Sequence, residues 1–234
     1  MTTISLEENL SRVKKEIERC AVASGRDASS VKLIAVSKTR SLEEVKAIVD
    51  LGQGCLGENT VQDAMTKIPH LSNKNIEWHY IGHLQSKKAG KIPGYFQWIH
   101  SVDSLKLAKK LSSALYTHSK NSVLNCLIQV NVSDEATKSG LQLDEVEPFI
   151  QEVMQHDLPC LRWRGLMTIG VRGNQEKTRH AFSKLRELQQ ACNKKFHLEN
   201  FDQLSMGMSG DYCMAIEEGA TMVRVGTSIF GERG

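Results

Sequence analysis

Eight short apolar runs alternate with helix-like segments along most of this chain, and this alternation limits the folds open to it. The predicted strands occupy residues 31–37, 54–57, 76–82, 97–102, 123–132, 161–169, 203–207 and 222–226. Strands that alternate with helices favour parallel pairing. Eight such units in 234 residues predict an α/β fold, a single-domain (β/α)8 barrel of the TIM type over residues 1–234. An open doubly wound sheet is the alternative, but no Gly-x-Gly-x-x-Gly follows the first predicted strand.

The two ends of the chain bear on how such a barrel would close. An amphipathic helix is predicted before the first strand, because apolar side chains recur at helical spacing at Leu6, Leu10, Val13 and Ile17. The chain stops at Gly234, so we expect neither a helix after the last strand nor a C-terminal β domain. The N-terminal helix is then expected to cover the gap that the missing final helix leaves.

The composition is ordinary for a globular protein, with 40% hydrophobic and 24% charged residues. The net charge of +3 is too small to argue for a nucleic-acid or membrane partner. Neither a secretion signal nor an apolar stretch long enough to span a bilayer is evident, which predicts a cytoplasmic location. Because no Cys-x-x-Cys pair occurs, neither a disulfide framework nor a zinc site is expected from Cys20, Cys55, Cys126, Cys160, Cys192 and Cys213.

A lysine ends the first predicted strand. Ile34, Val36 and Lys38 alternate along it and share one face, so the amine continues a line of core side chains. A desolvated lysine has a lowered pKa and can form a Schiff base with a carbonyl compound. The alternative is a strand-end lysine whose ammonium reaches water past the apolar surface.

Two other strand ends are suited to an anion. Ser209-Gly210-Asp211 precedes a helix predicted from Tyr212, so its amides are expected to point outward at a helix N-terminus. Gly226-Thr227-Ser228 ends the last strand and offers close backbone approach with two hydroxyls. TIM barrels frequently bind phosphate after their seventh and eighth strands. The alternative is an ordinary helix cap and a tight turn.

Arg224 lies two residues before Gly226 and therefore on the same strand face. A guanidinium in an apolar strand is costly without a partner, which could be a phosphate, a carboxylate or a ring nitrogen. A lysine, an anion cradle and an arginine are thus predicted at the rim where barrels of this type carry their chemistry.

Several blocks of sequence, in order from about Val31 to Gly231, resemble the YggS/PROSC family. These are the pyridoxal 5′-phosphate (PLP) homeostasis proteins, related to the N-terminal barrel of alanine racemase. The blocks are Val36–Thr39, Gly57–Gln62, Trp78–Lys88, Asn131–Gly140, Arg164–Ile169 and Leu204–Ser209. Small departures, at Tyr80 and Lys87, lie outside the expected cofactor contacts.

The resemblance implies a role for each candidate residue. Lys38 would carry PLP as a Schiff base, Asn59 would lie beside the ring and Arg224 would face the pyridine nitrogen. The phosphate would be held by Ser209, Gly226 and Thr227. The implied task is to hold PLP and keep intracellular PLP (vitamin B6) and amino-acid pools balanced, with PLP-requiring apo-enzymes as recipients and the protein as a monomer or weak homodimer.

Arg224 limits the chemistry that PLP could perform here. PLP is a strong electron sink when its ring nitrogen is protonated, and a guanidinium disfavours a second positive charge beside it. In alanine racemase, the resemblance implies, a second base comes from a C-terminal domain that this chain is expected to lack. We therefore expect a cofactor-binding protein with no catalytic residue. The alternatives are a low-activity amino-acid racemase and a cofactor-free Schiff-base aldolase acting on a phosphorylated sugar.

Three further features have competing interpretations. His79 and His83 lie four residues apart across a strand end, and the sequence offers no third metal ligand beside them. The basic segment 87–91 is either a solvated helix face or a phosphate or partner contact. Lys138 is a candidate for exchanging the cofactor with Lys38 near the rim.

Overall fold

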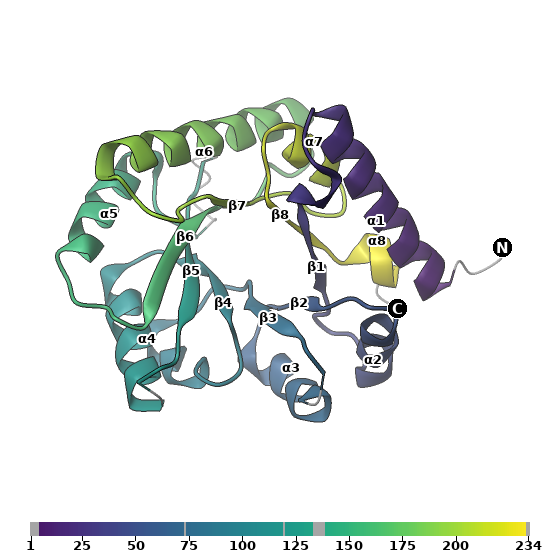
Figure 1. Ribbon diagram of the computed structural model, residues 1–234, viewed down its shortest axis with the longest axis horizontal. Coiled ribbons are helices and arrows are strands. Elements are labelled where there is room, and N and C mark those ends of the chain that lie inside the picture. The colour runs from purple at the N-terminus through teal and green to yellow at the C-terminus, as the bar shows by residue number, and fades with distance from the viewer. Residues whose placement is uncertain (1–4, 73, 119, 133–138, 233–234) are drawn as a thin grey trace.

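The computed structural model describes residues 5–72, 74–118, 120–132 and 139–232. Within these residues, eight parallel strands form a closed barrel in which each strand pairs with the next and the last pairs with the first (Figure 1). The strands are β1 (Lys32–Val36), β2 (Cys55–Glu58), β3 (Glu77–Tyr80), β4 (Trp98–Val102), β5 (Leu124–Gln129), β6 (Leu161–Met167), β7 (Gln203–Ser205) and β8 (Met222–Val225). The predicted (β/α)8 barrel is confirmed.

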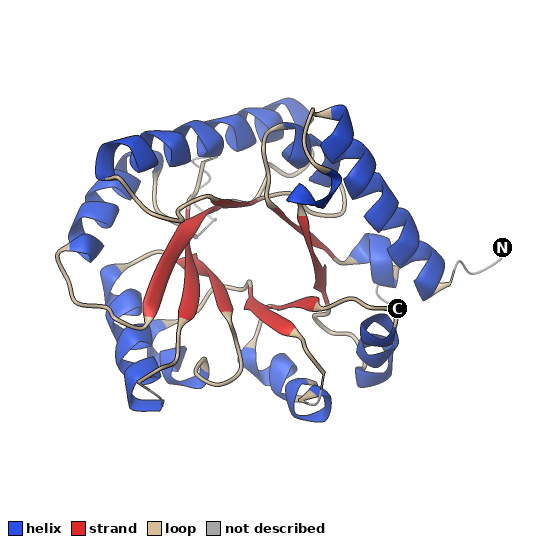
Figure 2. Ribbon diagram, in the orientation of Figure 1, coloured by secondary structure: helices blue, strands red, loops and turns tan. Residues whose placement is uncertain are grey.

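Helices surround the barrel and connect its strands (Figure 2). The α-helices are α1 (Leu6–Ala23), α2 (Leu42–Asp50), α3 (Val61–Met65), α4 (Leu105–His118), α5 (Val146–Met154), α6 (Gln175–Phe196), α7 (Tyr212–Glu217) and α8 (Thr227–Phe230). Shorter 3-10 helices are η1 (Ala28–Ser30), η2 (Ile68–Leu71), η3 (Ser86–Lys91) and η4 (Leu143–Glu145). The basic segment 87–91 lies in the 3-10 helix η3.

Local sequence explains where the best-defined helices begin. Ser41 caps α2 by accepting a hydrogen bond from the Glu44 amide, and the Glu44 carboxylate accepts one from the Ser41 amide. The Ser104 hydroxyl accepts a hydrogen bond from the Leu107 amide at the start of α4. Both caps agree with the sequence pattern.

The seam between β1 and β8 is covered by the first helix. α1 packs against α7 and α8, and it lies alongside α8 in the ribbon view (Figure 1). The Arg12 guanidinium donates to the Ser228 carbonyl oxygen at 3.4 Å. Contrary to the sequence prediction, a helix does follow the last strand, because Thr227–Phe230 form the single turn α8. That turn is too short to cover the seam, so α1 takes the position predicted for it.

Strand alternation divides the buried side chains into two layers. One parity faces the barrel axis, where an apolar layer is formed by Ile34, Trp98, Leu127, Met167 and Met222. The other parity, which includes Leu33 and Ala35, packs between the strands and the surrounding helices in the larger core. A polar or charged residue of the first parity must therefore find its partner inside the barrel or at one of its mouths.

One disulfide is present. The sequence analysis expected no disulfides, and that prediction was wrong. Cys20 on α1 is bonded to Cys213 on α7, 193 residues later in the chain. Both helices lie outside the barrel at the seam, so the pairing depends on a tertiary contact that no local spacing reveals. Cys126, Cys160 and Cys192 are buried as free thiols, as expected of small apolar side chains.

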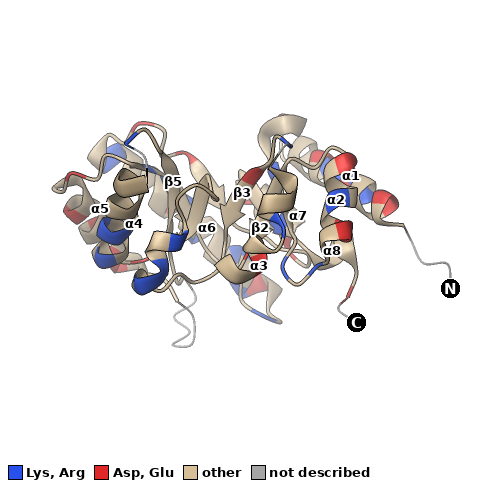
Figure 3. Ribbon diagram, turned by 90° about the horizontal axis from the view of Figure 1, so that it is seen from below, with Lys and Arg blue, Asp and Glu red and all other residues tan. Residues whose placement is uncertain are grey.

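Charged residues of both signs occur along the helices around the barrel, including α1 and α2 (Figure 3). In the described part of the chain, none of the helices has both the length and the apolar character needed to cross a bilayer.

Candidate functional site

A pocket of about 380 Å³ opens among residues at the carboxyl end of the strands, and it brings together every site residue predicted from the sequence. Its lining includes Lys38 and Asn59, which follow β1 and β2, and Arg224 and Gly226 from β8 and its end. Thr227 and Ser209 complete the set. The remaining lining is mainly apolar and is formed by Val36, Ile81, Met167, Ile169 and Met208, with Gly210.

The strand-face argument for Lys38 agrees with its surroundings. Ile34 belongs to the apolar layer inside the barrel, Val36 lines the pocket, and Lys38 lines the same pocket two residues further on. Thr39 then adopts a left-handed backbone conformation with φ of 61°, which turns the chain sharply after the lysine. The lysine side chain is thereby presented to the pocket from the end of a rigid strand.

Arg224 is 5% exposed, and its guanidinium is held by two groups of the barrel interior. One nitrogen donates to the Ser205 hydroxyl at 2.6 Å, and the other donates to the Thr168 carbonyl oxygen at 2.9 Å. Burial lowers the pKa of Arg224 to about 10, so the side chain remains charged at neutral pH. The partners proposed from the sequence did not include these two, and they fix the guanidinium at the pocket wall.

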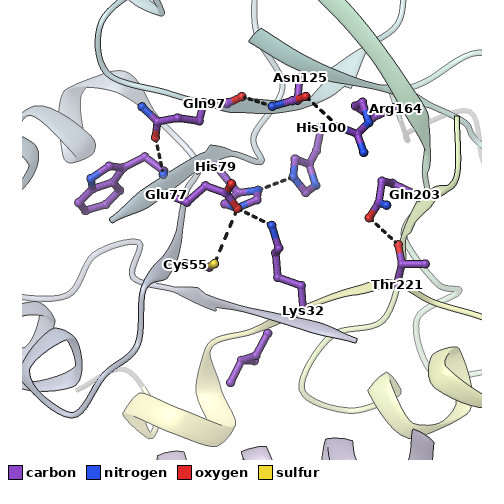
Figure 4. A network of polar contacts seen from close by, with 12 residues as sticks. Lys32, Cys55, Glu77, His79, Gln97, His100, Asn125, Arg164, Gln203 and Thr221 are labelled. Atoms are coloured by element: carbon purple, nitrogen blue, oxygen red, sulfur yellow. Dashed lines mark hydrogen bonds and ion pairs between the residues drawn. The ribbon is translucent and has the colours of Figure 1, made fainter. Parts of the chain in front are cut away.

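The Ser205 hydroxyl belongs to a hydrogen-bonded chain that crosses the barrel. Ser205 Oγ lies 2.8 Å from His100 Nδ1, His100 Nε2 lies 2.9 Å from His79 Nδ1, and His79 Nε2 lies 3.0 Å from Glu77 Oε1. Lys32 Nζ donates to the same carboxylate oxygen at 2.6 Å. Figure 4 shows the section from Lys32 to His100 at the amino end of the strands.

The protonation states of this chain follow from its donors. Arginine only donates, so Ser205 accepts from it and can donate its own proton to His100 Nδ1. Each neutral histidine then accepts at Nδ1 and donates at Nε2, ending at the Glu77 carboxylate. Burial lowers the pKa of both His79 and His100, which favours these neutral forms. The bonds therefore run in one direction from Arg224 to Glu77, and Lys32 donates to Glu77 from the other end.

His79 thus serves as an internal partner of His100, while His83 is a separate, half-exposed residue 3.7 Å from Asp103. Cys55, Glu77 and His79 do present ligand atoms within 4.8 Å of one another. The Lys32 ammonium already occupies the Glu77 oxygen there, as Figure 4 shows, and a cation would have to displace it.

The anion cradle is built from the loop after β7 and the end of β8. Ser209 Oγ accepts hydrogen bonds from the Gly226 and Ser228 amides, each at 3.3 Å. Two backbone N–H groups therefore already converge on one oxygen. A side chain at position 226 would press on β1, because its Cβ would lie 3.3 Å from the Val36 carbonyl oxygen. Glycine keeps this wall of the pocket open to close backbone approach.

The donor set of the pocket fits PLP. Converging amides and hydroxyls suit a phosphate, the Lys38 amine suits an aldehyde, and the buried Arg224 guanidinium is a donor for a ring nitrogen. The mostly apolar lining leaves room for a planar ring, with Asn59 at its edge. The Asn59 backbone is itself fixed by a close approach, since a Cβ on Gly82 would lie 2.0 Å from the Asn59 carbonyl oxygen.

The described residues also form hollows other than this pocket. One of about 280 Å³ adjoins the pocket and shares Asn59, Ile81 and Ile169 with it. The largest, about 1010 Å³, is an open groove along the start of α6 that is lined largely by charged side chains and contains none of the six predicted residues. Its size does not make it the site, because it lacks the lysine and the converging donors.

Comparison with known proteins agrees with this geometry. The family model described as "Alanine racemase, N-terminal domain" matches residues 6–234. A protein of Pseudomonas aeruginosa named "Pyridoxal phosphate homeostasis protein" is 43% identical over 234 residues, covering 100% of this chain and 97% of its own length. The chain therefore belongs to the family described as alanine racemase, N-terminal domain, together with this relative.

Solved structures extend the comparison. PipY of Synechococcus elongatus, in a structure described as having PLP bound, superimposes with a TM-score of 0.84 at 30% identity over 97% of this chain and 100% of its own. An alanine racemase of Clostridium difficile gives a TM-score of 0.76 at 15% identity, with 59% of its length covered, and so shows a shared fold alone. The fold expected from the resemblance is confirmed.

Sequence reasoning missed the residues that support the pocket from behind. Ser205 alternates with Leu204 and Met206 and could have been placed inside the barrel by strand parity. The buried Lys67 follows Asp63 by four residues, a spacing that indicates an ion pair on a helix. Lys138, proposed from the sequence as a second cofactor lysine, lies outside the described residues.

Proposed function

We propose that this chain binds PLP as a Schiff base through Lys38 and acts in intracellular PLP and amino-acid homeostasis, without efficient catalysis. The observation that carries the proposal is the convergence of Lys38, the buried Arg224 guanidinium and the Ser209–Gly226 cradle on one pocket. A relative at 43% identity carries the homeostasis name, and the PipY structure holds PLP.

In this proposal each residue has a distinct task. The Lys38 amine bonds the aldehyde carbon, and the amides and hydroxyls around Ser209, Gly226 and Thr227 hold the phosphate. Arg224 donates to the pyridine nitrogen, and Asn59 contacts the edge of the ring. PLP supplies an aldehyde that captures amines reversibly, so the same bond that stores it also allows its transfer to a PLP-requiring apo-enzyme.

Arg224 supports storage over catalysis. A guanidinium is only a donor, so a ring nitrogen beside it must accept a hydrogen bond and stay unprotonated. An unprotonated ring is a weaker electron sink, which leaves a carbanion at the amino-acid α-carbon poorly stabilised. The fixed position of Arg224 between Ser205 and Thr168 leaves little freedom to escape this limit.

The proposal is tested by absorbance and chemical trapping. After PLP is added to the purified protein and the excess is removed, the protein is expected to stay yellow, and borohydride reduction should leave a pyridoxyl group on the peptide that contains Lys38. A protein that is colourless once the excess PLP has been removed would overturn the proposal and favour the cofactor-free aldolase.

A weak amino-acid racemase is the second candidate, because the matching family model is described as an alanine racemase domain. It predicts exchange of the α-proton of an added amino acid in deuterated water, lost in Lys38→Ala. Absence of exchange in the PLP-loaded protein would exclude it.

A further inference from the structure

A second lysine, Lys67, is buried directly behind the strand end that carries Lys38. Lys67 is 1% exposed and lies between α3 and η2. Its Nζ donates to the Ser37 carbonyl oxygen, to Glu58 Oε1 and to Asp63 Oδ1, each at 2.8 Å. An ammonium has three protons, and each of them is used here. We refer to Ser37, Glu58, Asp63 and Lys67 as the Lys67 cluster.

The Lys67 cluster holds the backbone on both sides of Lys38. On one side, the Ser37 carbonyl oxygen accepts from Lys67, and the Ser37 hydroxyl donates to Glu58 Oε1 at 2.6 Å. On the other side, the Thr39 amide donates to Asp63 Oδ2 at 2.7 Å. Asp63 binds Lys67 through its other oxygen, so both neighbours of Lys38 are tied to the same ammonium.

The cluster and the pocket lie on opposite faces of the barrel wall. A Cβ on Gly57 would touch the Ile34 side chain, which places the Gly57 face inside the barrel and Glu58 outside it. Ser37 alternates in the same way with the pocket-lining Val36 and Lys38. Glu58 also directly precedes Asn59, so the cluster joins the ends of the two strands that deliver Lys38 and Asn59.

A purely structural role does not explain why this cluster is built from charged side chains. Replacing a buried ion pair by apolar side chains of similar volume is often neutral or stabilising, so burial of Lys67 and Glu58 is not the cheapest way to fill the space. Glu58 Oε2 is buried and has no hydrogen-bond partner among the described residues. Ion pairs and hydrogen bonds are directional, unlike apolar packing. Each of the three Lys67 contacts reaches Ser37 or Thr39, either directly or through one carboxylate.

We propose that Lys67 is a positioning residue that aims Lys38 into the pocket and thereby sets the rate at which its amine condenses with the aldehyde of PLP. This inference rests on the proposed function. In the condensation, the unprotonated Lys38 amine adds to the aldehyde carbon, a carbon–nitrogen double bond replaces the carbon–oxygen double bond, and one water leaves. Lys67 takes no part in these bonds and acts through the Ser37–Thr39 backbone.

The test compares Lys67→Met with Lys32→Met, which removes the Lys32–Glu77 ion pair between β1 and β3 at the amino end of the same barrel. We expect Lys67→Met to slow Schiff-base formation by about tenfold or more, because a displacement near 1 Å is enough for such a loss. Affinity for pyridoxine 5′-phosphate, which has no aldehyde, should change by less than about twofold under the same reasoning. Hydrogen exchange of the Thr39 amide should speed up in the ligand-free variant. Lys32→Met should leave all three measurements near the wild-type values.

Asp63→Ala provides a second variant, since the Asp63 side chain is 25% exposed and its loss is easier to tolerate than that of Lys67. It removes the acceptor of the Thr39 amide and should slow the condensation in the same direction. Wild-type rates and wild-type Thr39 exchange in Asp63→Ala, or in folded Lys67→Met, would overturn the positioning role. Failure of the wild-type protein to carry pyridoxyl on Lys38 would instead overturn the proposed function, so the two failures are distinct.

Discussion

Lys32 begins β1 and Lys38 follows its end with the same parity, yet the two ends of the barrel give them different surroundings. At the amino end, Lys32 Nζ is 2.6 Å from Glu77 Oε1 and lies 5.3 Å from the centre of the Trp98 ring (Figure 4 shows the Glu77 contact). At the carboxyl end, Lys38 lines a pocket whose charged wall is Arg224. Strand parity brings both lysines to the inner face of the barrel, but the lysine at the carboxyl end lines the pocket, whereas Lys32 is held in an ion pair.

The two glutamates that pair with lysines, Glu58 with Lys67 and Glu77 with Lys32, also differ in their surroundings. Burial raises the pKa of Glu58 to about 7, and hydrogen bonds from Lys67 and Ser37 offset it only in part. Burial also raises the pKa of Glu77, but hydrogen bonds from His79 and Lys32 outweigh it and hold the pKa well below its ordinary value. Glu58 is fully buried and Glu77 is partly exposed, so depth of burial separates the two ends.

The largest expected effect is on pyridoxyl labelling, and it distinguishes Lys38 from Lys32. Lys38→Ala should lose the pyridoxyl label trapped by borohydride, because the amine that forms the bond is gone. Lys32→Met should keep the label and lose about 1 kcal/mol of stability, the range of a partly exposed ion pair. Peptide mass spectrometry and urea unfolding measure the two quantities. A Lys38→Ala protein that still carried the pyridoxyl label would show that Lys38 is not the lysine that binds the aldehyde.

The two glutamates should give opposite pH profiles of stability. The folded pKa of Glu58 lies above its ordinary 4.5, so its contribution is present below about pH 4.5 and is lost as pH rises through about 7, by up to about 3 kcal/mol. Glu77 has a lowered pKa, so its contribution is present above about pH 4.5 and is lost as pH falls. Urea unfolding of Glu58→Gln across pH 4 to 8, and of Glu77→Gln from pH 6 down to about pH 2, should show differences from wild type that change in opposite directions. Parallel curves would remove the distinction drawn from burial.

Ser205→Ala tests whether the chain across the barrel links its two ends. The change removes one hydrogen-bond partner from each of two buried groups, Arg224 and His100, and should cost about 1–3 kcal/mol in the free energy of unfolding. Ser101→Ala is the matched control, since this buried serine makes one bond, to the Gly82 carbonyl oxygen at 2.6 Å. Equal losses in the two variants would show that the chain adds nothing beyond a single hydrogen bond.

The smallest expected effect concerns the phosphate cradle at the carboxyl end. Ser209→Ala should weaken PLP binding by about two- to tenfold, the value of one hydrogen bond. Binding of pyridoxal, which lacks the phosphate, should be unchanged. Equilibrium titrations with both compounds give the comparison. Equal weakening of the two would remove Ser209 from the phosphate site.

Strand periodicity was enough to predict the barrel and to bring the candidate residues to one rim. Lys38 and Arg224 share the parity of the barrel interior, and parallel strands put their carboxyl ends at the same edge. The residues that hold Lys38 and Arg224 in place could not be predicted from strand periodicity. Ser205 bonds His100 across 105 residues, and which interior groups meet depends on the stagger of the closed barrel, which sequence alone does not give.

Two other misses have a similar physical origin. Cys20 and Cys213 meet because α1 covers the seam and packs against α7. Lys67 follows a five-residue helix, too short for its periodicity to identify a buried face. In each case the missing information is the packing of one layer on another.

Closure at the β1–β8 seam has a consequence for how the protein is made. β1 pairs with β8 from Lys32 opposite Met222 to Ala35 opposite Val225, so the first strand waits for the last. The pocket straddles this seam, with Lys38 on one side and Gly226 and Thr227 on the other. During synthesis the N-terminal part emerges first, and these walls cannot meet until the final strand has left the ribosome. A nascent chain therefore cannot hold a ligand in this pocket. A ligand can bind there only after β8 has paired with β1 and closed the barrel.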